Sequence, residues 1–236
     1  MSKVRLPTTT LVHWPETYRL IPSRYPPVDL FERVAAPADW EMVAAIEGLT
    51  NDRLRDEIGE IALVPVEQRV SGPGASPIMA AFTHVGGPTR FSDGTYGVYY
   101  ASDRLEAAIR EVAHHHARFL KRTSEASTQV QMRTYVGSIR CELYDVRGKR
   151  PKVHDPDSHA EAQRLGEGVR TAGGSGLVFD CVRMRGAANV AVFRPNVLAS
   201  RSGKPHVVQG PHVVMDHDGT RMTRCIIVGQ PTWRAL

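Results

Sequence analysis

The spacing of apolar residues along the chain predicts three helices. The first lies within residues 29–47, where Asp39 can cap the helix start. The second extends from about Arg104 to Leu120, and the third from His154 to Gly168. In the second helix the apolar residues recur at helical spacing, at Leu105, Ala108, Ile109, Val112 and Phe119.

Other segments alternate apolar and polar residues, or are short and apolar, and these predict β-strands. The predicted strands and extended segments are 16–22, 62–70, 78–85, 96–101, 134–146, 177–182, 189–193 and 224–228. Loops rich in small and turn-forming residues separate several of them, at 71–77, 86–89 and 173–176. Strands dominate from residue 78 onward, and a few helices interrupt them. This mixture predicts an α+β domain, and no internal repeat divides it.

The amino-acid composition indicates the broad class of protein. The chain has 236 residues, of which 42% are hydrophobic and 23% charged, and these values are typical of a soluble globular protein. No run approaches the roughly 18 apolar residues of a membrane helix, and residues 1–14 lack the apolar stretch of a secretory signal. We therefore expect a cytoplasmic protein that does not contact a membrane. Cys141, Cys181 and Cys225 include no CxxC spacing, which favours reduced thiols over a disulfide framework.

The charge pattern narrows the range of partners only slightly. The formal net charge is +5 and the isoelectric point about 9.3, so the chain attracts anionic molecules. No basic stripe is interleaved with aromatic residues, so we expect no direct contact with nucleic acid. The chain also lacks the glycine fingerprint of a Rossmann fold and the P-loop motif. A basic pocket for a dinucleotide, or a basic surface for an acidic protein partner, explains the same charge.

Three segments together form a distinctive set of motifs. The first is 18–25, with the sequence Tyr-Arg-Leu-Ile-Pro-Ser-Arg-Tyr. The second is 82–94, which contains Gly-Gly-Pro-Thr-Arg-Phe, followed by 97–112, where a helix carries a Glu eleven residues after a strand Tyr. The third is 176–183, which ends in Phe-Asp-Cys-Val-Arg, followed by Asn-Val-Ala-Val-Phe at 189–193. The middle segment is the most specific part of the set.

These motifs resemble the RES family, named for its Arg, Glu and Ser residues, over about residues 16–195. The resemblance implies a fold similar to ADP-ribosyltransferase catalytic domains, with mixed and antiparallel sheets flanked by helices. Residues 1–236 would form a single RES-type domain, with 29–70 as a family-specific insertion. The resemblance also implies a bacterial toxin paired with an Xre-type helix-turn-helix antitoxin. Such toxins consume NAD⁺ by hydrolysis or phosphorolysis, or transfer ADP-ribose to a protein.

The resemblance assigns roles to individual residues. Glu111 matches the family's helix Glu, and Arg90 matches the Arg of its glycine-rich loop, so both are expected to be catalytic. The strand Tyr matches Tyr100. The family's first Arg matches Arg19, with Arg24 as a nearby substitute. The resemblance implies that Tyr100, Arg19 and Arg24, together with Arg90, bind NAD⁺.

Two positions depart from the family pattern. Cys181 stands where the family has its Ser, so a thiol takes the place of a hydroxyl among the expected catalytic residues. In the glycine-rich loop, residues 88–89 intervene before Arg90, and Ser92 replaces the usual Asn. His84 precedes this loop and is predicted to line the NAD⁺ site.

The chemistry of NAD⁺ suits these residue types. The planar fork of an Arg pairs with two phosphate oxygens, so Arg19 and Arg90 suit the pyrophosphate. Tyr100 can stack on the nicotinamide ring with its hydroxyl free, and the alanines at 107–108 leave room for a ligand. Cleavage of the nicotinamide–ribose bond develops positive charge on the ribose, which Glu111 can stabilise. Nicotinamide leaves as a neutral molecule, so no general acid is required. NAD⁺ is expected as the substrate, without a permanently bound cofactor.

Taken singly, these residues also have purely structural explanations. A lone Glu111 is typical of a solvated helix surface, and a lone Cys181 is typical of a small buried apolar residue. The neighbouring motifs favour the functional interpretation of Glu111. Residues 114–116 are three consecutive histidines, but adjacent helical side chains point about 100° apart and cannot all bind one ion. We therefore predict no metal site.

Three functions remain open from the sequence. The first is NAD⁺ consumption by a toxin that arrests growth. The second is ADP-ribosyl transfer to a protein, which shares the same glycosidic step. The third is a non-catalytic NAD⁺-binding module, suggested by the departures at Cys181 and in the Arg90 loop. The expected partners are NAD⁺ and an antitoxin, in a homo-oligomer or a hetero-oligomer with that antitoxin.

Overall fold

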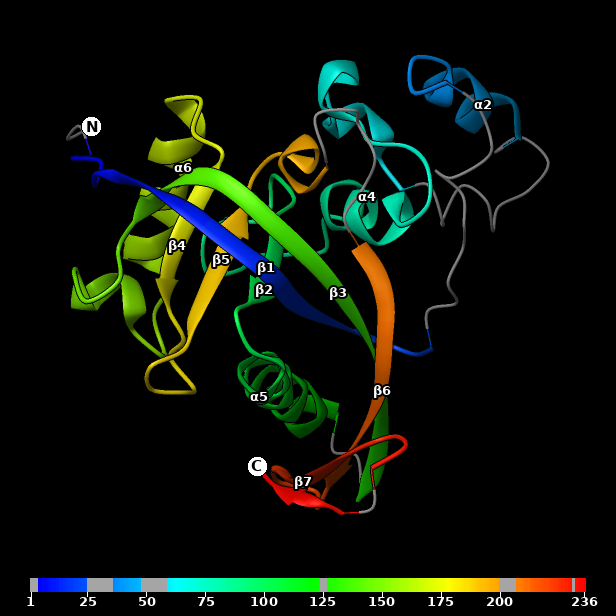
Figure 1. Cartoon of the computed structure of the whole chain (residues 1–236), viewed down its shortest axis with the longest axis vertical. Helices are drawn as coiled ribbons and strands as arrows, with labels where there is room; N and C mark the ends of the chain where they lie inside the picture. The colour runs from blue at the N-terminus through cyan, green and yellow to red at the C-terminus, as the bar shows by residue number, and fades with distance from the viewer. Residues whose placement is uncertain (1–3, 25–35, 48–58, 124–126, 200–206, 231) are drawn as a thin grey trace.

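Five strands pair in a closed circuit at the centre of the molecule (Figure 1). The computed structural model describes residues 4–24, 36–47, 59–123, 127–199, 207–230 and 232–236. The five strands are β1 (Thr9–Pro22), β2 (Tyr99–Ser102), β3 (Thr128–Asp145), β4 (Gly176–Asp180) and β5 (Ala188–Val192). Their order is β1-β2-β5-β4-β3, and β3 pairs again with β1. Only the β3–β4 pairing in this circuit is parallel, so the sheet is mixed, as the sequence predicted.

A second group of strands extends the sheet beyond this circuit. β6 (Val207–His217) pairs antiparallel with the first half of β3, β7 (Met222–Ile227) pairs with β6, and β8 (Arg234–Ala235) pairs with β7. In Figure 1 the green strand β3 runs from the circuit into this extension, and β6 and β7 curve around α5 (Leu105–Thr123). β3 therefore belongs to both parts of the sheet.

Helices flank the sheet on more than one side. The amphipathic helix α5 packs its buried face on β1, β3, β6 and β7, against Leu20, Met132, Val213, Met215, Met222, Cys225 and Ile227. α6 (Ala160–Thr171) packs against β4 and β5, and α4 (Ala75–Thr83) packs near β2. A Cβ on Gly97 would lie 2.3 Å from the Ala81 carbonyl oxygen, so glycine there lets α4 approach β2 closely. The remaining elements are α2 (Trp40–Glu47) and the 3₁₀ helices η1 (Ile61–Leu63), η2 (Val66–Gln68), η3 (Pro151–His154) and η4 (Pro195–Leu198).

The central strand β5 shows how the sheet is buried on both faces. All of its residues are buried. Val190 and Val192 belong to the cluster that includes α4, whereas Ala191 belongs to the cluster that includes α6. Because side chains alternate between the two faces of a strand, the apolar run 190–192 suits a strand that is covered on both sides.

Two predicted extended segments are helical instead. Residues 78–85 were expected to be a strand, but Ile78, Met79 and Phe82 are buried on one face of α4. A short apolar run fits either structure, and Pro77 is compatible with the first turn of a helix. The segment 62–70 contains two short 3₁₀ helices rather than an extended chain.

Other predicted boundaries also shift. The helix expected from His154 begins at Ala160, because residues 151–154 form η3. Phe119, expected on the apolar face of α5, is 51% exposed, and Leu120 takes the buried position. The strand β6 was not predicted. The expectation for residues 29–35 lies outside the described residues. Among those described, no helix is both long and apolar enough to cross a bilayer.

Candidate functional site

Glu111 lies half-buried on α5, beside the ends of β4 and β5. Two donors meet at one of its carboxylate oxygens: the Cys181 Sγ is 3.3 Å from Oε1, and the Asn189 Nδ2 is 3.2 Å from the same atom. Among the described residues, no side chain or backbone group donates a hydrogen bond to the other oxygen, Oε2. One carboxylate oxygen is therefore held by two side chains, and the other accepts no hydrogen bond from the described part of the chain.

The amide of Asn189 is held in turn by Ser102. The Ser102 Oγ donates to the Asn189 Oδ1 at 2.6 Å, and the two residues are direct cross-strand partners on β2 and β5. Both are buried. The sequence did not predict this pair: Asn189 stood in a motif without a role. Next to this pair, the Asp103 carboxylate accepts a hydrogen bond from the backbone N–H of Ala188.

Cys181 supplies the second donor. Burial, and next the negative charge of Glu111, raise the pKa of the Cys181 thiol to about 11. The thiol is therefore protonated at neutral pH and donates as a serine hydroxyl would. Cys181 packs with Ala107 and Ala187 in a small buried cluster. The expectation that Ala107 leaves its face open for a ligand is wrong, because Cys181 and its neighbours cover that alanine.

Arg90 is held by η3 and by the loop that follows it. Its Nη1 donates to the backbone oxygens of Val153 at 3.0 Å and Asp155 at 2.9 Å. Burial lowers the pKa of Arg90, and the nearby negative charge of Glu111 opposes this effect. The loop that carries Arg90 sits tightly on α6, since a Cβ on Gly166 would lie 2.2 Å from the Phe91 carbonyl oxygen. These contacts place the guanidinium within electrostatic range of Glu111.

Tyr100 fastens the same loop from the side of the sheet. Its hydroxyl lies 2.8 Å from the Thr89 Oγ1 and accepts a hydrogen bond from the Phe91 N–H at 3.0 Å. The expectation of a free hydroxyl is therefore wrong. Burial raises the pKa of Tyr100 to about 12, so the phenol stays neutral. The Arg19 Nη1 donates to the backbone oxygen of Tyr100 at 3.2 Å, and its guanidinium lies over the Tyr99 ring. Arg19 thus supports Tyr100, which supports the Arg90 loop.

A further arginine, Arg183, lies at the turn after β4. Its Nη2 is 2.8 Å from the His114 Nε2 and 3.4 Å from the Pro156 backbone oxygen. Arg90 and Arg183 therefore both bind the loop that joins η3 to α6. Burial, followed by the charge of Arg183, lowers the pKa of His114, so this imidazole is a neutral acceptor. The sequence contained Arg183 within a motif, but no role was assigned to it.

The remaining predicted ligands lie at the surface. Arg24 is exposed in the turn after β1, and burial together with the charge of Arg24 lowers the pKa of His116 on α5. His84 is exposed after the end of α4, and its Nδ1 is 3.0 Å from the Thr83 Oγ1. Their contacts with NAD⁺ stay predictions.

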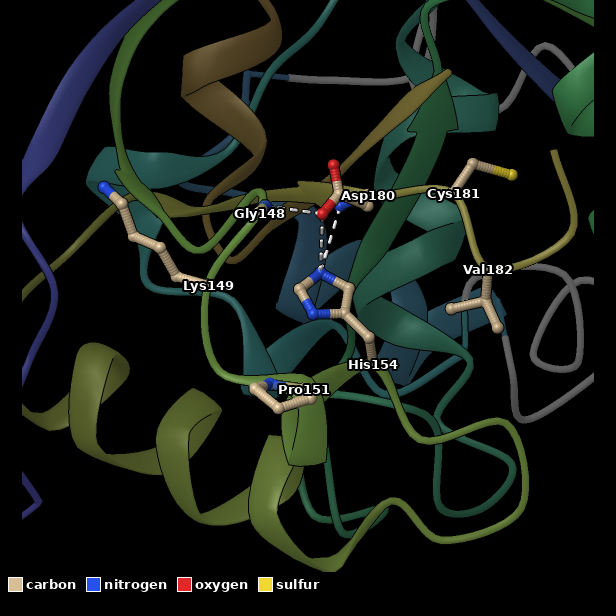
Figure 2. A pocket seen from close by; sticks show the side chains of 7 residues that line it. All are labelled: Gly148, Lys149, Pro151, His154, Asp180, Cys181 and Val182. Carbon is tan, nitrogen blue, oxygen red and sulfur yellow. Dashed lines mark hydrogen bonds and ion pairs between the residues drawn. The ribbon is translucent and has the colours of Figure 1, made fainter. Parts of the chain in front are cut away.

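A pocket of about 460 Å³ adjoins the end of β4 (Figure 2). It is lined by Gly148, Lys149, Pro151, His154, Asp180, Cys181 and Val182. The Asp180 N–H donates to the His154 Nε2 at 3.1 Å, and the Gly148 N–H donates to the Asp180 Oδ2 at 2.6 Å. Figure 2 shows these groups gathered on one side of the strand end, with the Cys181 sulfur directed away from His154. The pocket therefore adjoins Cys181, but Glu111 is not among the residues that line it.

The class of protein follows from comparison with known families. The family model described as RES domain matches residues 66–212, which is more than half of the chain. This chain belongs to the RES domain family, and the resemblance predicted from its motifs is confirmed.

Two individual proteins are also similar to the chain. The uncharacterized protein y4oC of Sinorhizobium fredii (strain NBRC 101917 / NGR234) is 29% identical over 209 residues, which cover 88% of this chain and 85% of that protein. Among solved structures, the M. tuberculosis MbcT–MbcA toxin–antitoxin complex contains a chain that aligns with 56% of this one and over 72% of its own length. That alignment has 15% sequence identity and a TM-score of 0.38.

Proposed function

We propose that this RES-domain protein consumes NAD⁺ by cleaving the nicotinamide–ribose bond. The observation that carries the proposal is the state of Glu111: two donors hold Oε1, and Oε2 has no partner among the described residues. A carboxylate held in this way is ready to stabilise positive charge without reorganising. Such charge develops on the ribose when its bond to nicotinamide breaks.

The chemical step balances with few participants. The bond between the ribose C1′ and the nicotinamide nitrogen breaks, and its electron pair moves to the nicotinamide, which becomes neutral. Glu111 stabilises the oxocarbenium-like ribose during this change. Water or phosphate then adds to C1′ and loses a proton to solvent. In this scheme Arg90 binds the pyrophosphate, because a guanidinium pairs with two phosphate oxygens.

We further propose that the protein is the toxin of a toxin–antitoxin system. Its membership of the RES family supports this role, because the motifs that define the family imply a toxin with an Xre-type antitoxin. Loss of NAD⁺ would arrest growth in a cell that lacks the antitoxin. The excess of basic residues in the chain would favour an acidic surface on that partner.

Incubation of the purified protein with NAD⁺, with and without phosphate, tests the enzymatic proposal. We expect nicotinamide release, and mass analysis of the other product separates ADP-ribose from phosphorylated ADP-ribose. Label transferred from NAD⁺ to a protein would instead indicate ADP-ribosyl transfer. An intact NAD⁺ pool under all of these conditions would contradict the proposal. Expression in bacteria tests the toxin role: growth arrest should occur with the natural chain and disappear with Glu111→Gln.

A further inference from the structure

The hydrogen bonds behind Glu111 have a defined direction. The side chain of Asn189 has one acceptor, Oδ1, and one donor group, Nδ2. An ionised carboxylate can only accept, so the Nδ2 group must face Glu111, whose Oε1 it reaches at 3.2 Å, and Oδ1 then accepts from the Ser102 hydroxyl at 2.6 Å. If the amide were reversed, its oxygen would lie against the carboxylate and the bond to Glu111 would be lost. Ser102 therefore anchors the far end of the amide that contacts Glu111.

Burial makes this arrangement effective. Ser102 is 4% exposed and Asn189 is 5% exposed, so water does not compete strongly for their polar atoms. The two residues face each other on paired strands, and α5, which carries Glu111, begins three residues after Ser102. The chain of contacts thus runs from one strand to the next and then to the helix, with each member on a regular element.

The strands do not depend on this pair for their connection. β2 and β5 pair at four successive positions, from Tyr99 opposite Val192 to Ser102 opposite Asn189. The backbone ladder would hold the strands together with other side chains at the last position. A purely structural pair would therefore affect stability, whereas a pair that orients Glu111 would affect turnover.

We propose that Asn189, anchored by Ser102, is a positioning residue that presents Glu111 to the substrate. Asn189 and the Cys181 thiol bind Oε1, and this leaves Oε2 directed at the ribose. The proposal rests on the proposed function in naming the ribose as the target. In this proposal neither Ser102 nor Asn189 touches the reacting atoms. Their contribution is the orientation of the carboxylate.

Steady-state kinetics of Ser102→Ala, Ser102→Thr and Asn189→Asp test this proposal. Ser102→Ala removes the hydrogen bond that anchors the amide oxygen, so we expect kcat to fall about tenfold, as for the loss of a positioned hydrogen bond, with KM within about twofold. Ser102→Thr keeps the hydroxyl and should recover most of the loss. Thr134→Ala, at an equally buried threonine of β3, is the matched control and should leave kcat unchanged.

Asn189→Asp gives a second readout, which tests the contact between Asn189 and Glu111 directly. The new carboxylate would lie against Glu111, and two adjacent carboxylates tend to share one proton. The acid limb of the kcat/KM profile should therefore move to higher pH. Equal kcat in Ser102→Ala and the natural chain, or an acid limb that stays in place in Asn189→Asp, would overturn the proposal.

A measurement without substrate separates this proposal from the proposed function. The carboxyl carbon of Glu111 can be followed by NMR as pH is changed, in the natural chain and in Asn189→Asp. We expect it to titrate at higher pH in the variant, whether or not the protein consumes NAD⁺. If NAD⁺ is not consumed, the proposed function fails while the contact is still tested. An unchanged titration would show that residue 189 does not contact Glu111.

Discussion

Arg69 and Glu111 are both charged side chains held by several hydrogen bonds, yet their surroundings differ. Arg69 is almost wholly buried, with 1% of its side chain exposed. It donates to the backbone oxygens of Val64 at 2.9 Å, Pro37 at 2.9 Å and Ile61 at 3.3 Å, and it also pairs with the Glu41 carboxylate. All three of its nitrogens have a partner. Arg69 therefore joins α2 to the 3₁₀ helices and has no nitrogen without a partner for a ligand.

Glu111 has the opposite character. Its contacts from Cys181 and Asn189 meet at one oxygen, and Arg90 lies within electrostatic range. The other oxygen keeps its capacity to interact. A buried charge whose hydrogen bonds are complete stabilises the fold, whereas one that is held firmly but incompletely can act on a ligand. The comparison separates a structural cluster from a candidate active site within one chain.

The largest expected effect comes from removing the charge of Glu111. Glu111→Gln should lower NAD⁺ consumption by about a thousandfold, since positioned electrostatic groups of this kind contribute about 10²–10³ in rate. Nicotinamide release measures the loss. Glu106→Gln on the same helix is the control, because Glu106 is an exposed carboxylate paired with Arg110. A Glu111→Gln variant with near-natural turnover would refute the assignment of Glu111.

Arg69→Met should lower the stability of the protein and leave its turnover unchanged, which is the reverse of the result expected for Glu111→Gln. The substitution keeps an apolar stem but leaves several buried carbonyl oxygens without a charged donor. We expect the free energy of unfolding to fall by about 3 kcal/mol, with kcat of the remaining folded protein unchanged. Urea denaturation followed by circular dichroism measures the first quantity. A large loss of kcat with unchanged stability would place Arg69 in the functional site and break the comparison.

A smaller effect is expected at Cys181. Cys181→Ala removes one of two donors to Glu111 Oε1, so turnover should fall about tenfold, the value of one hydrogen bond to a charged group. Cys181→Ser restores a donor and should recover most of that loss. If alanine and serine gave equal turnover, the thiol would act by packing alone.

The smallest effect concerns pH. The pKa of the Cys181 thiol is raised from 9.0 to about 11, so the native protein holds this proton more tightly than the unfolded chain. The resulting stability is complete below about pH 9 and is lost as pH rises toward 11. Unfolding in urea at pH 8 and pH 10.5 measures the decrease. The decrease should be shallower in Cys181→Ser, because serine does not ionise in this range, and an equal decrease would contradict this account.

The sequence predicted the elements whose patterns are long or are bounded by turn residues. The helix of Glu111 and the strands β2, β4 and β5 all lie close to their predicted positions. The RES resemblance also singled out Glu111, Arg90 and Cys181 as one set. Local patterns of this kind depend on neighbouring residues, so they can be recognised without tertiary structure.

Only the tertiary structure decided which atoms meet. α4 became a helix because its apolar residues are buried on one helical face, which a short run of sequence could not distinguish from a strand. Tyr100 uses its hydroxyl to fasten the Arg90 loop, although the sequence suggested a free hydroxyl. Asn189 and Glu111 are 78 positions apart and are brought together by the strand order β2-β5-β4. Residue types and local periodicity are present in the sequence, but the direction of each hydrogen bond depends on the three-dimensional placement of both partners.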